Sequence, residues 1–298
     1  MVGEQMVSAY ARGSEFGTNQ PLVTVIIPSF NHEKYIYQSI ESVVSQTYKN
    51  VEIIVIDDGS NDQSLKIIGD LAGKYGFIVI ARDNRGIAKT LNEGIGLANG
   101  KYISFLGSDD YYLPQRIENA VFQLEQCADR VAFVYCDGYI VNDAGRKVSL
   151  FSGRHPRPLV GCIYDNLLIG NWIPGLGVTY KTDVLKQFMF DERFMIEDYT
   201  LFLRMFKGEK YKLAYYRDLG FAYRWHGNNI SRPSELVDCE YKLIHHHFED
   251  VGRYAEFKQR LKTRSFPGIE MWRWKNMYLL CLHLLRLFQK TVTARNVT

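Results

Sequence analysis

A short apolar segment that ends in two adjacent carboxylates constrains this chain more than any other feature. Residues 102–106 (YISFL) lie between Gly100 and Gly107, and Asp109 and Asp110 come soon after them. An apolar run of this length between glycines is typical of a strand that is buried on both faces. In an open parallel sheet, ligands bind beyond the carboxyl ends of the strands. The two carboxylates therefore predict a site for a hard divalent cation with open positions for phosphate oxygens.

The alternative is that one of the two aspartates caps a helix that begins near Pro114. The surrounding chain favours the ligand site, because strand and helix patterns alternate along it. We expect strands at 23–27, 51–56, 78–81 and 102–106, with helices between them at 35–46, 62–75 and 87–98. This alternation predicts βαβ units and a parallel sheet, whose right-handed crossovers place all four strand ends on one edge.

Every one of these strand ends carries polar or charged side chains, namely Asn31, Asp58, Arg85, Asp109 and Asp110. Polar turns alone do not require three carboxylates and an arginine on one edge, so we interpret the edge as a ligand site. Asp58 taken by itself is ambiguous. It could accept hydrogen bonds from a base or ribose, or it could simply form a turn before Gly59.

The second half of the chain has a less regular pattern. We expect a helix at 115–126, a strand at 131–137, a hairpin at 139–148 that turns at 142–145, and a short helix at 159–168. Further on we expect a strand at 177–180, a helix capped by Thr182 that ends at 188, a helix at 199–206 opened by Glu197 and Asp198, a strand pair at 212–216 and 220–225, and a helix at 235–248.

The composition excludes several classes of protein. The 298 residues are 46% hydrophobic, which is enough for the core of one large domain or two small ones, and a net charge of +3 gives no argument for nucleic-acid binding. The five cysteines are scattered without the spacing of a metal site, which favours a reducing compartment. We see no secretory signal and no apolar run near the roughly 20 residues that span a bilayer. We therefore expect a cytoplasmic protein, and we leave residues 1–18, which look like a cloning tag, out of the fold.

Gly94 and Gly96 resemble the start of a dinucleotide-binding fingerprint, but their position argues against one. That motif must follow a strand and open a helix. Here the two glycines close a helix and precede a strand, and Asn99 stands where the third glycine belongs. The loop after the first strand contains no glycine, so we exclude a Rossmann dehydrogenase.

Three segments together resemble the family 2 glycosyltransferases of the bacterial surface-glycan type: VTVIIPSFNHEKYIYQSIESVVSQTYKNVEIIVIDDGSNDQS, NRGIAKTLNEGI and GKYISFLGSDDYYLP. The resemblance covers residues 22–230 in order. It implies an α/β glycosyltransferase-A fold with a mostly parallel central sheet flanked by helices. Within a catalytic domain at 19–232, residues 19–125 would form a Rossmann-like nucleotide-sugar half and residues 126–232 an acceptor half. Residues 233–298 would form a C-terminal helical extension.

The resemblance also implies roles for the strand-end residues. It implies nucleotide contacts from Pro28, Phe30, Asn31, Asp58, Arg85 and Asp109, with Arg85 near the diphosphate and Asp109 on ribose or metal. Ser108-Asp109-Asp110 matches the family's acidic metal motif, so Asp110 would be the main ligand of Mn²⁺ or Mg²⁺. A cation there would neutralise the charge that develops on the leaving nucleoside diphosphate.

Glu197 and Asp198 form a second candidate pair. FDERFMIEDYTLFLRM resembles the family segment that carries the catalytic base. Inverting transfer needs a carboxylate within hydrogen-bond reach of the acceptor hydroxyl. We assign this role to Asp198 and place Glu197 in the acceptor or sugar pocket. The alternative is that both acids only stabilise a helix N-terminus.

His226 and Trp172 complete the candidate site. His226, in YRWHGNNIS, would be a metal ligand by resemblance, since neutral imidazole can ligate Mn²⁺, and the alternative is a structural histidine. Trp172, in GNWIPGLG, would line the sugar or acceptor pocket, and core packing is its alternative. We interpret residues 245–247, three histidines on a predicted helix, as surface residues because consecutive helical positions face different directions.

The sequence thus predicts an inverting, metal-dependent glycosyltransferase. It would move a sugar from a nucleotide sugar, which we expect to be a UDP-sugar, to a glycan or lipid-linked glycan acceptor in surface polysaccharide biosynthesis. One alternative is a nucleotidylyltransferase, but the Gly-rich basic loop expected after its first strand is missing. The other is a non-catalytic scaffold that binds glycan or lipid, and the presence of all the candidate carboxylates argues against it.

The end of the chain has a different character. Residues 251–298 carry ten basic and two acidic side chains, a net charge of +8, which leaves −5 on the preceding 250 residues. Within this tail, residues 268–290 mix tryptophans and leucines with arginines and lysines. Such a basic helix fits an interfacial anchor on anionic lipids, which would place the protein on the inner face of the cytoplasmic membrane. The alternative is an amphipathic helix packed on the catalytic domain or on a second subunit.

We expect the full-length chain to float with anionic liposomes at low salt and not with neutral ones, because each basic residue near an anionic surface contributes about 1 kcal/mol. The matched control replaces four basic residues of the segment by glutamine: Arg273, Lys275, Arg286 and Lys290. This variant should lose flotation. An unaltered chain that does not bind at low salt would contradict the anchor.

Overall fold

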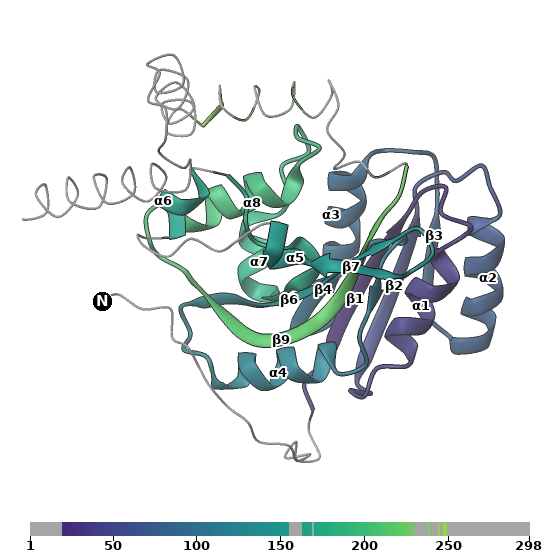
Figure 1. The fold of residues 1–298 in the computed structure, drawn as a ribbon, viewed down its shortest axis with the longest axis horizontal. Helices are drawn as coiled ribbons and strands as arrows, with labels where there is room; N and C mark the ends of the chain where they lie inside the picture. Colours follow the sequence, from purple (N-terminus) through teal and green to yellow (C-terminus); the bar gives the residue numbers. More distant parts are fainter. Residues whose placement is uncertain are drawn as a thin grey trace, which may run out of the picture.

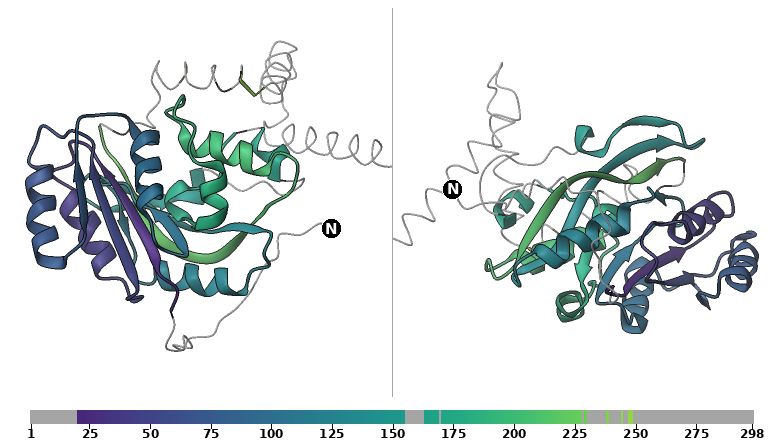
Figure 2. Two further views of the ribbon diagram at one scale, coloured as in Figure 1. Left: turned by 180° about the vertical axis from the view of Figure 1, so that it is seen from behind. Right: turned by 90° about the horizontal axis from the view of Figure 1, so that it is seen from below.

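The computed structural model describes residues 20–154, 163–168 and 170–227, together with residues 229, 238, 244, 247 and 248. Over these residues the chain forms an α/β fold in which helices cover both faces of one curved sheet (Figures 1 and 2). No helix in this part of the chain is long and apolar enough to cross a membrane. The expected basic segment at 268–290 lies outside the described residues, as does most of the helix expected at 235–248.

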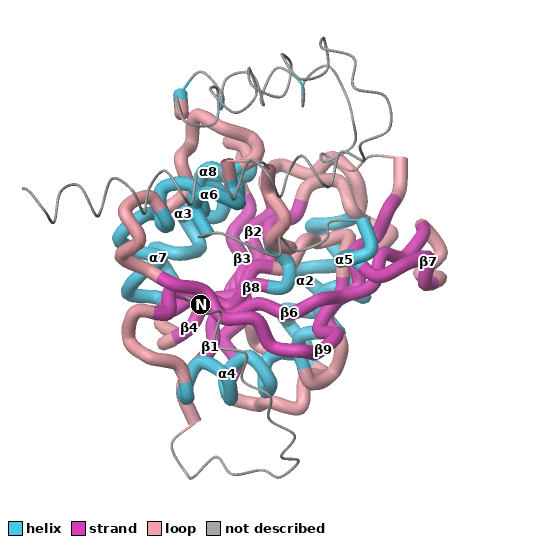
Figure 3. Tube along the Cα trace, turned by 60° about the vertical axis from the view of Figure 1, so that its left-hand side comes forward, coloured by secondary structure: helices cyan, strands magenta, loops and turns pink. Residues whose placement is uncertain are grey.

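The described residues contribute nine strands to the sheet, which runs in the order β3-β2-β1-β4-β8-β6-β9-β5, with β7 paired to β6. Their bounds are β1 (Val23–Ser29), β2 (Val51–Asp57), β3 (Ile78–Ala81), β4 (Tyr102–Phe105), β5 (Tyr111–Tyr112), β6 (Val131–Asn142), β7 (Lys147–Leu150), β8 (Val178–Lys181) and β9 (Lys212–Trp225). Figure 3 shows these strands running through the centre of the molecule with helices on either side.

The first four strands are parallel neighbours, as the βαβ pattern predicts. β1 pairs with β2 and β4, and β2 pairs with β3, all in the parallel sense. The loops that follow these strands therefore share one edge of the sheet. The later strands make the sheet mixed as a whole, because β8 runs antiparallel to both β4 and β6, and β5 runs antiparallel to β9.

Two long strands replace elements that we expected to be interrupted. β6 runs without a break from the strand predicted at 131–137 into the predicted hairpin, for which β7 is the return strand. The strand pair expected at 212–216 and 220–225 is likewise one strand, β9, which lies parallel to β6 (Figure 2). A shift in their register near Asp137 lets β9 carry extra residues where we expected a turn.

The helices follow the predicted order with small changes at their ends. Their bounds are α1 (Ile36–Val44), α2 (Ser64–Tyr75), α3 (Ile87–Leu97), α4 (Arg116–Gln126), α5 (Phe151–Arg154), α6 (Ile163–Leu167), α7 (Thr182–Phe188) and α8 (Glu197–Phe206), with a 3₁₀ turn η1 (Gly175–Gly177). Thr182 is the first residue of α7 and not its cap, since its hydroxyl donates to the Gly100 carbonyl at 2.7 Å. The residue before α4, Gln115, makes no side-chain cap, and the N–H of Ile117 in the first turn donates to Oε1 of Gln46 at 3.0 Å, so the alternative in which an aspartate of the 109–110 pair caps this helix is wrong.

The two faces of the sheet bury separate sets of apolar side chains. Along β1, Ile26 points to the face covered by α3, α6, α7 and α8. Its neighbours Val25 and Ile27 point to the other face, which is covered by α1, α2 and α4. This period-two alternation requires apolar residues at consecutive positions, which explains why the strands are continuous apolar runs.

Gly94 has a packing role in this arrangement. It lies on the face of α3 that meets β1, and a Cβ added there would lie 2.6 Å from Cγ2 of Ile26. Gly96 lies in the same helix, is exposed, and has nothing within 4 Å of an added Cβ. The pair that resembles a dinucleotide fingerprint therefore includes one glycine that the close contact between helix and sheet requires.

We expect Gly94→Ala to lower the free energy of unfolding by about 1–3 kcal/mol, because the new methyl overpacks the contact with Ile26. Gly96→Ala should instead raise it by up to about 1 kcal/mol, because alanine has the higher helix propensity. Chemical denaturation of both variants measures the difference. Equal effects of the two substitutions would contradict this packing.

Candidate active site

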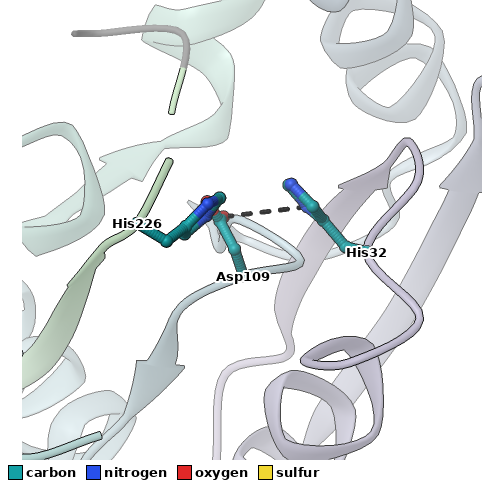
Figure 4. Close-up of side chains that lie close together, drawn as sticks. All are labelled: His32, Asp109 and His226. Carbon is teal, nitrogen blue, oxygen red and sulfur yellow. Dashed lines mark hydrogen bonds and ion pairs between the residues drawn. The ribbon is translucent and has the colours of Figure 1, made fainter. Parts of the chain in front are cut away.

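Three side chains from separate parts of the sequence converge at the carboxyl-end edge of the parallel strands. His32 comes from the loop between β1 and α1, Asp109 from the loop after β4, and His226 follows the end of β9 (Figure 4). Nε2 of His226 lies 2.9 Å from Oδ2 of Asp109, and Nδ1 of His32 lies 4.0 Å from Oδ1 of the same carboxylate. We call these three residues the His-Asp-His cluster.

The His-Asp-His cluster fits a divalent metal ion. Within the described part of the chain, it is the group whose donor atoms, one from each residue, all lie within 4.8 Å of one another. One carboxylate and two imidazoles are donors that first-row divalent cations accept. Burial lowers the pKa of His32 below its ordinary value, so its imidazole is neutral at neutral pH, which is the form that ligates a metal.

Arg224 fixes the loop that carries Asp109. Its side chain is almost fully buried, and its Nε donates to the Asp109 carbonyl at 2.8 Å. The two terminal nitrogens donate to the Asp143 carbonyl at 2.7 Å and to Oε1 of Gln38 at 2.6 Å. One guanidinium thus joins the end of β9 to the loop after β4, the turn between β6 and β7, and α1.

Asp110 contributes no donor atom to the His-Asp-His cluster. It is buried, and its Oδ1 accepts the backbone N–H of Arg224 at 2.7 Å. Burial and then the charge of Asp109 raise the pKa of this carboxyl well above its ordinary range. The expected role of Asp110 as main metal ligand stays a prediction, and the structure brings Asp109, not Asp110, next to His226.

Asp58 directly follows β2, and its buried side chain contacts the loop before α3. Its carboxylate accepts the backbone N–H groups of Arg85 at 2.8 Å and Gly86 at 3.0 Å, and it pairs with Arg82. These contacts show that Asp58 shapes the loop that presents Arg85, which agrees with a structural role for it. The nucleotide contact predicted for Asp58 stays a prediction. The Arg85 side chain is exposed at this edge.

The remaining predicted nucleotide residues lie on the loop after β1. Pro28 is half-buried within β1, whereas Phe30 is 44% exposed. Asn31 adopts a left-handed conformation with φ 55°, and its Oδ1 accepts the backbone N–H of Asn61 at 2.8 Å. This contact joins the loop after β1 to the loop after β2.

Asp198 lies in the first turn of α8 and is only partly exposed. Its Oδ2 accepts a hydrogen bond from Nδ2 of Asn171 at 3.1 Å, and its Oδ1 accepts the backbone N–H of Tyr199 at 2.6 Å. Burial raises the pKa of Asp198 to about 6 although both hydrogen bonds oppose this shift. A carboxylate that titrates near neutral pH suits a general base. Glu197 is half-buried beside it.

Trp172 belongs to the core in this structure. It is 5% exposed, and its ring meets that of Tyr135 edge-on at a centroid distance of 5.9 Å. Its Nε1–H has no hydrogen-bond partner among the described residues. The core alternative therefore accounts for its surroundings, and its place in a sugar pocket stays a prediction.

Sequence reasoning missed three residues of the site: His32, Arg224 and Asn171. His32 carried a usable signal, because it follows the first strand at the same edge as Asp109. Arg224 and Asn171 carried none, because their partners lie far away in the sequence, at positions 109 and 198. Only the folded chain brings them together.

We expect Asp198→Asn to stabilise the protein at pH 7. The raised pKa means that the folded state holds the proton more tightly than the unfolded state, so stability falls as pH rises from about 4 to 6. The amide of the variant does not ionise, so the variant does not lose stability over this pH range. Its free energy of unfolding should exceed that of the wild type by about 1–2 kcal/mol at pH 7. The difference should vanish near pH 4. Urea denaturation at both pH values measures it, with the exposed Asp70→Asn as control, and a pH-independent difference would contradict the prediction.

The comparison with known sequences identifies a family. The family model for Glycosyl transferase family 2 matches residues 24–180, more than half of the chain. An uncharacterized glycosyltransferase of Rickettsia prowazekii is 40% identical over 123 residues, which are 41% of this chain and 38% of that protein. The Escherichia coli UDP-Glc:alpha-D-GlcNAc-diphosphoundecaprenol beta-1,3-glucosyltransferase WfaP is 40% identical over 124 residues, 41% of this chain and 48% of that protein. The chain thus matches less than half the length of either relative.

Solved structures share the fold. S. aureus TarS in complex with UDP-GlcNAc matches with a TM-score of 0.57 at 22% identity, over 72% of this chain and 61% of that chain. The mannosyltransferase PcManGT of Pyrobaculum calidifontis, in complex with GDP-Man and Mn²⁺, matches with a TM-score of 0.52 at 18% identity, over 72% and 59%. These likenesses confirm the expected glycosyltransferase-A fold. The family match does not support the nucleotidylyltransferase alternative, and the chain belongs to Glycosyl transferase family 2.

Proposed function

We propose that this protein is an inverting, metal-dependent glycosyltransferase that moves a hexosyl or N-acetylhexosaminyl group from a UDP-sugar to a lipid-linked glycan in surface polysaccharide biosynthesis. The observation that carries the proposal is the His-Asp-His cluster at the carboxyl-end edge of the sheet. In an open α/β sheet this edge is where nucleotides bind, and the cluster offers donors for a cation that accompanies a diphosphate.

The relatives support the choice of donor and acceptor. The E. coli relative uses UDP-Glc, and its acceptor is a GlcNAc-diphosphoundecaprenol. TarS binds UDP-GlcNAc, and PcManGT binds a nucleotide sugar together with Mn²⁺. A membrane-borne acceptor also agrees with the basic tail expected to meet anionic lipid. We therefore place the protein in the cytoplasm, at the inner face of the membrane.

The proposed reaction is a single displacement. A divalent cation at the cluster would act as a Lewis acid that neutralises the negative charge developing on the diphosphate. Asp198 takes the proton of the acceptor hydroxyl while the hydroxyl oxygen forms a bond to the anomeric carbon. The bond from that carbon to the diphosphate oxygen breaks, and its electron pair leaves with the nucleoside diphosphate. Attack from the face opposite the leaving group inverts the configuration.

The other site residues would serve the donor. We place Phe30, Asn31 and the loop shaped by Asp58 around the nucleoside, with Arg85 near the diphosphate. Arg85 is suited to this role because its side chain is exposed, whereas Arg82 is already engaged by Asp58 and Glu93. Arginine binds phosphate oxygens through a planar set of N–H donors.

We expect Asp198→Asn to lower the turnover number for transfer from a UDP-sugar to a lipid-linked diphosphate acceptor by about 10²–10⁴-fold, because the amide cannot accept the acceptor proton. UDP-sugar binding in the presence of Mn²⁺, measured by calorimetry across a panel of sugars, should stay unchanged. The exposed Asp70→Asn serves as control in both measurements. Undiminished turnover in Asp198→Asn would rule out this base, and a wild type that binds no UDP-sugar would rule out the donor class.

A further inference from the structure

We propose that His32 is a third protein ligand of the divalent cation, so that the cation is held by two imidazole nitrogens and one carboxylate and the site selects Mn²⁺ over Mg²⁺. The inference deepens the proposed function, since it rests on a cation at the Asp109 loop. It concerns a residue in the loop after the first strand, far in the sequence from the other two ligands.

The loop after β1 is built to hold His32 at the site. The residue before it, Asn31, has φ 55°, a conformation that Asn tolerates better than most residues and that turns the chain toward the strand ends. The backbone N–H of Asn31 donates to Oγ of Ser60 at 2.9 Å, and that of His32 donates to Oγ of Ser64 at 2.9 Å. These contacts tie the loop to the segment after β2 and to the start of α2, so backbone hydrogen bonds hold the main chain of His32 in place.

Nδ1 of His32 lies close to the loop that carries Ser108 and Asp109. Its Nδ1 lies 2.7 Å from Oγ of Ser108 and 4.0 Å from Oδ1 of Asp109. The rings of His32 and His226 stand at 89° to each other with centroids 5.6 Å apart, on two sides of the carboxylate (Figure 4). Donor atoms bound to one cation at about 2.1 Å lie up to about 4.2 Å apart, so the cluster needs only a small contraction to close on a cation.

The cluster is protected on one side and open on the other. The His226 side chain is 5% exposed, and the ring of Tyr35 lies 5.0 Å from it, centroid to centroid. The His32 side chain is 20% exposed. Three protein ligands leave further coordination positions on the exposed side, where two phosphate oxygens of a nucleoside diphosphate can bind.

The donor set predicts the choice of metal. Mg²⁺ prefers six oxygen ligands in a nearly ideal octahedron, whereas imidazole favours transition-metal ions. A site with one imidazole tolerates both ions, and a second imidazole shifts the preference further from Mg²⁺. His32 therefore determines the metal specificity, and Co²⁺ should replace Mn²⁺ more readily than Mg²⁺ does.

The alternative role for His32 is structural, through its contact with Ser108. His32→Gln separates the two roles, because an amide can still hydrogen-bond the Ser108 hydroxyl but supplies no imidazole nitrogen. His247→Gln is the matched control, since His247 is exposed and contacts Arg193, away from the cluster. Thermal midpoints in the presence of a chelator show whether each variant keeps its fold.

The experiment titrates the full-length protein with Mn²⁺ alone and in the presence of UDP, with free Mn²⁺ followed by its EPR signal. We expect His32→Gln to weaken Mn²⁺ binding by about tenfold or more, to change Mg²⁺ competition much less, and His247→Gln to leave both unchanged. Pulsed EPR of bound Mn²⁺ should show coupling to two imidazole nitrogens in the wild type and to one in His32→Gln.

Three results would overturn the proposal: no Mn²⁺ binding by the wild type with or without UDP, coupling to fewer than two imidazole nitrogens in the wild type, or unchanged Mn²⁺ affinity in His32→Gln. The nitrogen count in the wild type decides the matter even if the variant does not fold. None of these measurements involves sugar transfer, so a failed transfer assay leaves the outcome for His32 distinct from the outcome for the proposed reaction.

Discussion

The buried guanidinium of Arg224 is the contact on which the geometry of the site depends. It donates hydrogen bonds to four oxygens from three other parts of the chain, while the backbone N–H of Arg224 donates to Oδ1 of Asp110. Arginine suits this role because its planar group donates in several directions at once. Since the β9 strand ends one residue later and His226 follows, the same residue that fixes Asp109 also fixes the direction in which His226 leaves the sheet.

This arrangement explains why the long β6–β9 pairing matters for a site at the other end of the sequence. β9 reaches the site only because it continues past the point where we expected a turn. If it ended near Tyr216, Arg224 and His226 would have no defined position relative to Asp109. Asn229 reinforces the same end, because its Nδ2 donates to the Arg224 carbonyl and its Oδ1 accepts the backbone N–H of His226. The second half of the chain therefore orients the loop of the first half that carries Asp109.

The first half of the fold could be predicted because its signals are local. β1, β2 and α3 follow from apolar periodicity within short windows, and the edge that gathers Asp58 and Asp109 follows from the parallel order of the strands. The second half could not be predicted as well, because the continuity of β9 depends on pairing with β6, some eighty residues earlier, and on a shift of register that no local pattern encodes. For the same reason the contacts of Arg224 with Asp109 and of Asn171 with Asp198 were invisible in the sequence.

The carboxylates of the site divide by the hydrogen bonds they receive. Asp58 accepts two backbone N–H groups and pairs with Arg82, so its charge is satisfied and it serves to shape a loop. Asp198 has fewer compensating contacts for its burial, and its raised pKa shows that the protein loses stability when this group ionises. A carboxyl whose charged form is disfavoured by burial binds a proton more readily than an ordinary aspartate, as a group that takes up a proton during a reaction must. This difference in pKa and hydrogen bonding between Asp58 and Asp198 supports the proposed catalytic role of Asp198 more strongly than its position in the fold does.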